Sequence, residues 1–304
     1  MRNVYTVVSS IVARTIKRVA LSAAEMTMLQ VLLVVVVVIS GGLVAAGKNE
    51  TRCAPQCTCR RKSPSSAFAM DCSGDGGRYP LAHLNMVNVS SSVSDLDLSN
   101  SSLTSLSSSS LRGFSRLQTL SVRWSRLAIV DSGAFRGTQL RRLDLRGNRL
   151  TAIRPRSFVG VQMTLVELDL SWNKITAIDD AFVDLASLSR LNLCHNLLAS
   201  LSARSFRGLT SLRHLRLDDN LIAEVDRLSF STLSQLTNLV LRGNPLSSLT
   251  TLHFADNVPL SYLDLSECSL LMVPRGVPDT VTYLQLRRNN ITRLSYDDFI
   301  GASK

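Results

Sequence analysis

One eleven-residue pattern recurs along most of the chain and limits what it can fold into. The pattern is L-x-x-L-x-L-x-x-N-x-L, and about thirteen further residues follow each copy. Copies begin at residues 93, 117, 140, 165, 188, 212, 236, 260 and 281. Tandem copies in one register predict a solenoid, because each repeat can bury its apolar side chains only against its neighbours.

The spacing of the leucines predicts a short strand in every repeat. L-x-L alternation puts both leucines on one face of a strand. Because a return segment separates each strand from the next, successive strands must pair in parallel. The unit has the signature and period of a leucine-rich repeat. We therefore expect an α/β solenoid of horseshoe form, with nine strands over residues 93–300 in a concave parallel β-sheet and a cap strand near Phe68–Cys72.

Two further columns of the repeat are predicted to build the interior. The ninth position is asparagine at residues 148, 173, 196, 220, 244 and 289, and an inward amide can satisfy backbone groups of adjoining turns. Ser101, Ser125 and Cys268 occupy this position elsewhere, so Cys268 is expected to be a buried structural thiol. A second column is expected to stack beneath the convex side, and it consists of Phe135, Phe158, Phe182, Phe206, Phe230, Phe254 and Phe299.

Residues 1–47 are predicted to be a targeting segment. Basic residues up to Arg18 precede an apolar stretch, Met26–Gly47, that ends in small residues suited to cleavage. We favour a cleaved signal peptide. The alternative is an uncleaved signal anchor, because the apolar stretch is long enough to span a bilayer. Both interpretations place the rest of the chain outside the cytosol.

The cysteines of residues 48–92 fit an exported protein. Cys53, Cys57, Cys59 and Cys72 lie within twenty residues as C-x3-C-x-C-x12-C, and an even cluster predicts two disulfides rather than a zinc site. Cys194 and Cys268 belong to repeats three apart, too distant for a disulfide, so both are expected to be unpaired. Candidate glycosylation sites of the form Asn-x-Ser/Thr are Asn49, Asn88, Asn100 and Asn290.

The chain resembles the extracellular leucine-rich-repeat proteins that carry an N-terminal cysteine cap, such as Toll-like receptors, Slit-like proteins, small leucine-rich proteoglycans and variable lymphocyte receptors. The segment CAPQCTCRRKSPSSAFAMDC and the repeat with its phenylalanine carry this resemblance, which covers residues 53–300. It implies the pairs Cys53–Cys59 and Cys57–Cys72. Such proteins usually end in a C-terminal cysteine cap, which residues 93–304 lack, so we expect a fragment. The alternative is that this end docks against a partner.

Solvent-facing positions of the predicted strands supply candidate binding residues. These are Arg123, Trp124, Arg142, Arg146, Glu167, Trp172, Arg190 and Arg216. The two tryptophans occupy the eighth position of repeats two turns apart, about 10 Å at the usual strand spacing. Exposed tryptophan beside arginine is typical of interaction hot spots. The alternative is that the charges solvate the sheet and the tryptophans pack along its edge.

The sequence predicts a binding protein rather than an enzyme. Its four histidines are scattered over different repeats, and we expect no cofactor or metal. Cys194 and His195 are neighbours, but strand alternation should point them to opposite sides. The resemblance implies an extracellular recognition ectodomain of an innate-immune or adhesion receptor, with a secreted matrix protein of the proteoglycan type as the alternative. The net charge of +11 favours acidic partners, anionic glycans or membrane surfaces, and charge alone does not choose among them.

The expected ligand is a protein or an anionic glycan on the concave face. Nucleic acid is a weaker candidate. A membrane is expected to be contacted only through residues 26–47 or through a span that follows the chain.

Overall fold

The computed structural model describes residues 57–62, 67–74, 90–183, 185–255 and 258–294. The described residues all belong to one compact unit, Arg52–Lys304. The predicted targeting segment lies outside the described residues, as do Cys53, Asn49, Asn88 and Phe299. Among the residues that are described, no helix combines the length and apolarity needed to cross a membrane.

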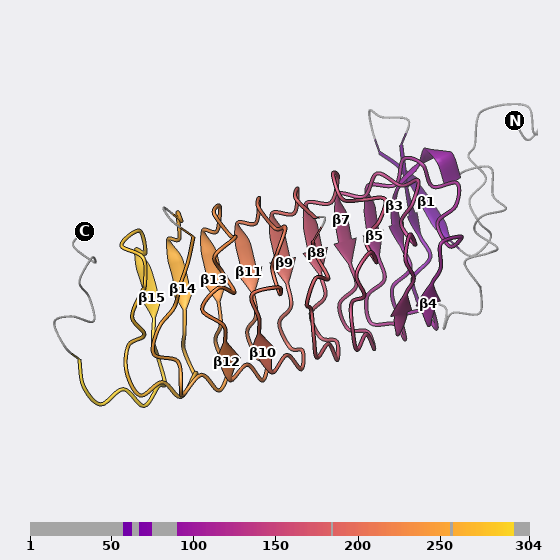
Figure 1. The fold of residues 1–304 in the computed structure, drawn as a ribbon. Coiled ribbons are helices and arrows are strands. Elements are labelled where there is room, and N and C mark those ends of the chain that lie inside the picture. The colour runs from indigo at the N-terminus through magenta and orange to yellow at the C-terminus, as the bar shows by residue number, and fades with distance from the viewer. Residues whose placement is uncertain (1–56, 63–66, 75–89, 184, 256–257, 295–304) are drawn as a thin grey trace, which may run out of the picture. The chain divides into compact units, whose positions relative to one another are not determined.

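An eleven-stranded sheet runs along the whole described region (Figure 1). Its order is β1-β2-β3-β5-β7-β8-β9-β11-β13-β14-β15. The strands are β1 (Thr58–Arg61), β2 (Phe68–Asp71), β3 (Val93–Asp97), β5 (Thr119–Ser121), β7 (Arg142–Asp144), β8 (Glu167–Asp169), β9 (Arg190–Asn192), β11 (His214–Arg216), β13 (Asn238–Val240), β14 (Tyr262–Asp264) and β15 (Tyr283–Gln285).

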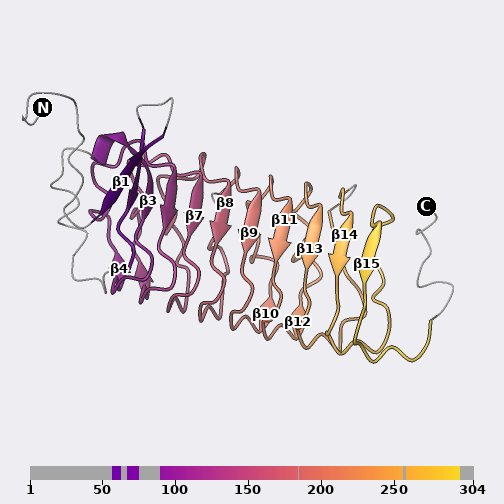
Figure 2. The same ribbon diagram turned by 180° about the vertical axis from the view of Figure 1, so that it is seen from behind.

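The strand register confirms the nine predicted parallel strands, from β3 to β15. The same leucine of each repeat pairs with its counterpart in the next, as Leu120 does with Leu143 and Leu143 with Leu168. The predicted cap strand is β2, which pairs in parallel with β3, while β1 closes that end antiparallel to β2. Seen from behind, the strands still follow one another in chain order (Figure 2).

The return segments consist mainly of turns. Two two-stranded parallel pairs reinforce them, β4 (Ser105–Leu106) with β6 (Ile129–Val130) and β10 (Ser200–Leu201) with β12 (Glu224–Val225). Within the described residues, the 3-10 helix η2 (Ser90–Ser92) is the one helical element. The return segments of the expected α/β solenoid therefore consist of turns rather than α-helices in the described residues. The repeat at 260 is three residues short, yet β14 and β15 keep the register, so its return segment absorbs the difference.

The phenylalanine column stacks as predicted beneath the return segments. Ring centroids are 6.0 Å apart for Phe135 and Phe158, 6.2 Å for Phe158 and Phe182, and 5.9 Å for Phe206 and Phe230. Their side chains are buried, whereas Phe254 is only half-buried. These stacked rings join neighbouring repeats on the side opposite the leucines of the sheet.

The asparagine column also behaves as predicted. Asn148 donates from Nδ2 to the carbonyl oxygens of Val122 and Leu145, at 2.6 and 2.9 Å, and accepts from the backbone N–H of Leu127. The same bonds recur at Asn173, Asn196, Asn220 and Asn244. Each amide thus ties its own turn to the preceding one.

The cysteines divide into a cap set and a buried set. Cys57 and Cys72 form a disulfide, as the resemblance implied. Cys59 is also disulfide-bonded, and its expected partner Cys53 lies outside the described residues. Cys194 and Cys268 are free and buried, which confirms that they do not pair with each other. Cys268 fills an asparagine position and donates from Sγ to the carbonyl oxygen of Leu241.

Candidate functional site

The solvent-exposed side of the eleven-stranded sheet, here called the sheet face, carries most of the candidate binding residues. Parallel register places the third positions of successive repeats side by side, as in Arg142, Glu167 and Arg190. A shallow hollow of about 600 Å³ lies over this face and spans strands β2 to β11. Half of its lining residues are charged, so any occupant must satisfy polar groups.

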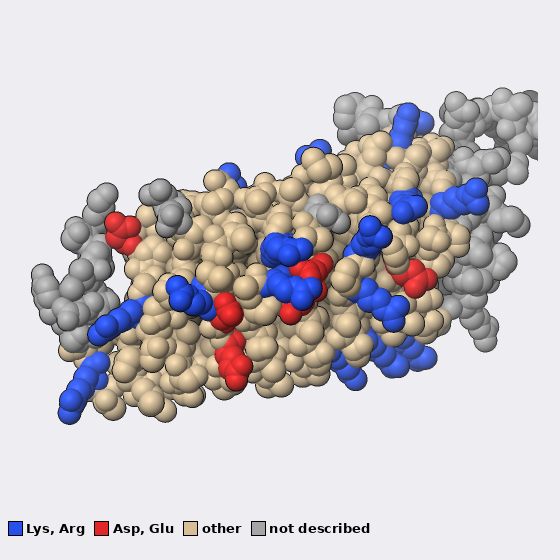
Figure 3. Space-filling model, in the orientation of Figure 1, with Lys and Arg blue, Asp and Glu red and all other residues tan. Residues whose placement is uncertain are grey.

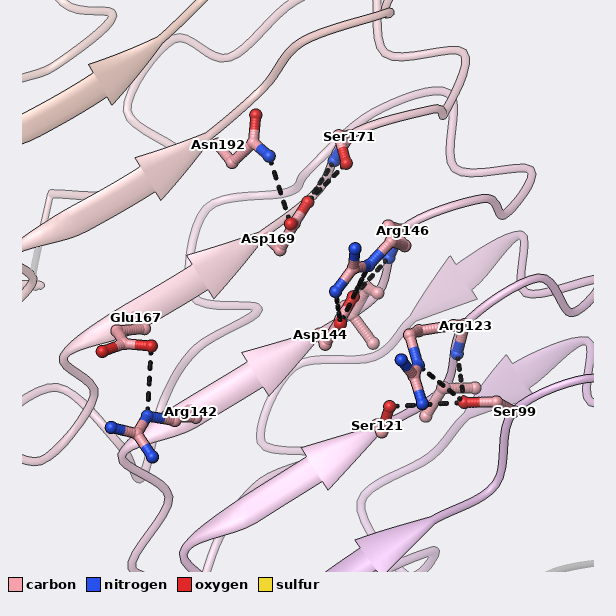
Figure 4. Close-up of polar contacts among 12 residues, drawn as sticks. Ser99, Ser121, Arg123, Arg142, Asp144, Arg146, Glu167, Asp169, Ser171 and Asn192 are labelled. Atoms are coloured by element: carbon pink, nitrogen blue, oxygen red, sulfur yellow. Dashed lines mark hydrogen bonds and ion pairs between the residues drawn. The ribbon is translucent and has the colours of Figure 1, made fainter. Parts of the chain in front are cut away.

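Glu167 lies between two arginines of neighbouring strands. Its Oε2 accepts from Nε of Arg142 at 3.1 Å (Figure 4). Its Oε1 forms an ion pair with Arg190. Both arginines are more exposed than the glutamate. One carboxylate therefore serves two guanidinium groups, whose outer donors remain open to solvent.

The other candidate arginines also have acidic neighbours. Arg123 pairs with Asp97 at 3.0 Å, Arg146 with Asp144 at 2.5 Å and Arg216 with Asp218 at 2.8 Å. Hydrogen bonds that these arginines donate to Asp144 and Asp218 raise the pKa of Arg146 and of Arg216, so both stay charged. Basic and acidic side chains are interleaved in the middle of Figure 3. The sheet face is therefore a mixed-charge surface rather than a basic one.

His214 lies within the same face, close to two arginines. Burial lowers its pKa, and the charges of Arg190 and Arg213 lower it further. The imidazole is consequently neutral at pH 7 and can both donate and accept a hydrogen bond.

The eighth residue of every repeat has left-handed backbone geometry, with φ between 50° and 72°. This column, at the turn where each strand ends, consists of Asn100, Trp124, Gly147, Trp172, His195, Asp219, Gly243, Glu267 and Arg288. L residues rarely adopt this conformation outside turns. Because its geometry is the same for tryptophan, glutamate and glycine, the turn rather than the side chain sets it.

Trp124 and Trp172 are joined across Gly147. Their ring centroids are 6.1 Å apart and their planes are tilted by 50°. A Cβ atom on Gly147 would lie 2.2 Å from Cε3 of Trp124, so the ring occupies the space of a missing side chain. The rings are thus closer than the 10 Å expected from strand spacing alone. Trp124 is 54% exposed and Trp172 50%.

His195 and Asp219 extend this aromatic pair. The imidazole of His195 stacks on Trp172 with centroids 3.8 Å apart, and its Nε2 lies 3.4 Å from Oδ2 of Asp219. Sequence reasoning missed both residues as neighbours of the tryptophans. Comparing all residues of the eighth column would have found them. Cys194 is buried beside the partly exposed His195.

The remaining predicted sites are surface positions or lie outside the described residues. Asn100 and Asn290 are exposed and accessible for glycosylation. No cluster of three or more potential metal ligands occurs among the residues described.

The repeats match the family model described as "Leucine rich repeat" over residues 91–150, 115–175, 138–198, 163–222 and 210–270. The chain belongs to the leucine-rich-repeat family. It is 30% identical over 129 residues to human "Leucine-rich repeats and immunoglobulin-like domains protein 3", covering 42% of this chain and 11% of that protein. It is 32% identical over 129 residues to Toll-like receptor 3 of Boselaphus tragocamelus, covering 40% of this chain and 14% of the receptor. The matched region is thus a small part of each relative.

Solved structures show the same fold. The structure of TLR13 in complex with ssRNA13 superimposes with a TM-score of 0.65 and 23% identity, over 82% of this chain and 35% of that chain. The APL1 leucine-rich repeat domain gives a TM-score of 0.56 and 24% identity, over 65% of this chain and 50% of that chain. A leucine-rich-repeat domain of this kind supports receptor-like recognition and protein–protein interaction.

Proposed function

We propose that this leucine-rich-repeat domain is the extracellular recognition part of an innate-immune or adhesion receptor and that its sheet face binds a protein. The observation that carries the proposal is the ion-paired surface centred on Glu167, with Arg142 and Arg190 at its two oxygens. Exposed pairs of this kind are weak, so a partner can replace one member by its own charge at little cost. A mixed-charge protein surface has the complementary chemistry, and no catalytic role is proposed.

The kinds of relatives support this proposal. A Toll-like receptor and two leucine-rich-repeat and immunoglobulin-like proteins match the repeats. The Cys57–Cys72 disulfide is typical of an exported domain. A secreted matrix protein of the proteoglycan type would use the same fold, and it is distinguished by binding to fibrous proteins.

The test reverses one charge at the centre of the sheet face. The full chain, secreted from cultured cells, is screened against a panel of extracellular proteins that includes fibrillar collagen. We expect Glu167→Arg to lower the affinity for a protein ligand by about tenfold or more, because it places three like charges together. Arg154→Glu is the control, since Arg154 is an exposed residue of a return segment.

Two outcomes would contradict the proposal. The first is that every ligand found tolerates Glu167→Arg, which would remove the sheet face from recognition. The second is that collagen is the sole panel member bound, which would favour the matrix alternative. Secretion yield and circular dichroism of both variants check that each has folded.

A further inference from the structure

A second surface lies at the turn where the strands end, and it differs from the sheet face in charge. It comprises the eighth and tenth positions of the repeats at 117, 140 and 165, which we call the strand-exit edge. Its residues are Trp124, Arg126, Gly147, Arg149, Trp172 and Lys174. We propose that this edge binds a sulfated glycan chain, independently of any protein bound to the sheet face.

The cations of the edge form a row with one member per repeat. The backbone N–H of Arg149 donates to the carbonyl oxygen of Leu127 at 2.8 Å, and that of Lys174 to Leu150 at 2.9 Å. These bonds hold the tenth positions of successive repeats in register. Arg126, Arg149 and Lys174 are therefore spaced about 5 Å apart from one repeat to the next.

These three cations lack acidic partners, unlike the arginines of the sheet face. All three are exposed, and no acid of the described residues forms an ion pair with any of them. Positions six to fourteen of these three repeats contain no aspartate or glutamate. Their charge is thus available to a ligand, whereas a polyanion approaching Arg123, Arg146 or Arg216 would be repelled by the carboxylate paired with each of them.

The tryptophans add flat apolar surface two residues before the cations in the turn. Gly147 seats the ring of Trp124, and His195 backs the ring of Trp172 at 3.8 Å, so both rings are held in place. Rigid aromatic faces provide contact area with little entropy to lose. Guanidinium and ammonium groups bind sulfate and carboxylate oxygens through charge-assisted hydrogen bonds.

A sulfated glycan matches this combination better than a protein surface does. The edge offers cations and aromatic faces without acids, which suits a uniformly anionic chain whose rings can lie against tryptophan. The tenth position changes to Leu197 and Leu221 in the next two repeats, so the row of cations ends there. The site therefore takes a short segment, about 10 Å from the first cation to the third.

The chain has only two tryptophans, and both lie on this edge. Intrinsic tryptophan emission consequently reports on the proposed site alone. We expect a heparin tetrasaccharide to change the tryptophan emission of the full chain. Its affinity should fall as the salt concentration rises, because exposed charges are screened over about 8 Å at physiological ionic strength. Trp124→Phe and Trp172→Phe separate the contribution of each ring.

Three triple variants that remove equal charge locate the site. The edge triple is R126S/R149S/K174S, the sheet-face triple is R123S/R146S/R216S, and the return-segment triple is R112S/R136S/R154S. The edge triple is expected to bind heparin tetrasaccharide about tenfold more weakly or worse, and the other two to bind like the wild type. A glutamine version of the edge triple, R126Q/R149Q/K174Q, should behave identically if the serine version folds poorly.

Each remaining outcome would overturn the proposal. An equal loss of heparin affinity in all three triples would mean that net charge alone matters. A loss confined to the sheet-face triple would place the heparin site on the sheet face instead. Heparin binding without any change in tryptophan emission would separate the ligand from the rings. A single-stranded oligonucleotide or a poly-glutamate peptide that binds the edge more tightly than heparin would reject the glycan class. None of these results depends on the protein ligand proposed for the sheet face.

Discussion

Asn196 donates its side-chain N–H to the carbonyl oxygen of Leu170, which lies in the preceding repeat, over 3.0 Å. Its Oδ1 also accepts from the backbone N–H of Ile175 at 3.0 Å, and all these groups are buried. Asn196→Ala leaves both backbone groups without their partner, so we expect it to lower the free energy of unfolding by about 3 kcal/mol. Urea denaturation followed by far-ultraviolet circular dichroism measures the loss.

Two further substitutions make the asparagine prediction specific. Asn196→Cys should cost less than Asn196→Ala, since Cys268 donates from Sγ in the same place to Leu241 at 3.3 Å. Gln139→Ala is the surface control, because Gln139 is an exposed amide side chain, and its expected change is within about 0.5 kcal/mol. Equal effects at positions 139 and 196 would show that the buried amide is not what joins the turns.

Gly147 supports the ring of Trp124, and a methyl group there should disturb the ring. Gly147→Ala places a Cβ atom 2.2 Å from Cε3 of Trp124 and adds a side chain at φ 69°. We expect a loss of stability above the 1–2 kcal/mol or so that left-handed geometry alone costs, together with a shift in tryptophan emission. In a Trp124→Ala background the steric part should vanish and only the conformational part remain.

Gly137→Ala is the matched control for that experiment. Gly137 also has positive φ, 81°, but no atom lies within 4 Å of an added Cβ. Gly137→Ala should lower the stability only by the conformational cost of an alanine at positive φ, both in the wild type and in the Trp124→Ala background. If Gly147→Ala and Gly137→Ala cost the same, the contact between Trp124 and Gly147 contributes nothing.

The Cys57–Cys72 disulfide closes a loop of 15 residues over the first strands of the sheet. Replacing both cysteines with alanine should lower the free energy of unfolding by about 3 kcal/mol, because the unfolded chain regains the freedom that the loop removed. Thermal unfolding without reductant tests this, and proteolysis should then begin in the cap. Cys194→Ala is the control, because it removes a cysteine that forms no disulfide. An unchanged melting temperature would contradict the prediction.

The two free thiols should make stability depend on pH. Burial raises the pKa of Cys194 and of Cys268 to about 11, above the ordinary value of 9.0. The unfolded chain therefore loses these protons first. Their contribution to stability is complete below pH 9 and is lost as the pH rises towards 11. The wild type should destabilise over this range more than the Cys194→Ala/Cys268→Ala variant, as urea titrations at each pH would measure.

The burial of Cys194 and Cys268 also predicts that their thiols react slowly with alkylating reagents below pH 9. In the folded chain both thiols should resist iodoacetamide at pH 8, and in urea both should react, because the thiolate is the reactive form. Rapid alkylation of native Cys194 would mean that its side chain is accessible and would remove the basis for the pH prediction.

The sheet and its interior could be predicted from the sequence because one spacing determines both. The leucines fix the strands, and the register then brings asparagine to asparagine and phenylalanine to phenylalanine. Which ion pairs form could not be predicted, since Glu167 has arginines on both sides and side-chain conformation decides the contacts. The sequence placed Arg123, Arg146 and Arg216 among the candidate binding residues, and the structure gives each of them a carboxylate partner.

The close approach of the two tryptophan rings could not be predicted for a related reason. Strand spacing gives the separation of Cα atoms, but the turn directs the rings along the solenoid, and a missing side chain at Gly147 lets them meet at 6.1 Å. Aligning whole columns of the repeat, rather than selecting exposed charges, would have revealed both Gly147 and the row of cations at the tenth position.

The repeat at 260 has an evolutionary consequence. It is three residues shorter than its neighbours, yet β14 and β15 pair without a shift. Changes of length are therefore tolerated on the return side, while the eleven residues that contain each strand must be kept whole. Gene duplication or unequal recombination that inserts or deletes a complete period would leave every remaining strand with a partner. The binding surface can thus gain or lose complete repeats while the fold stays the same.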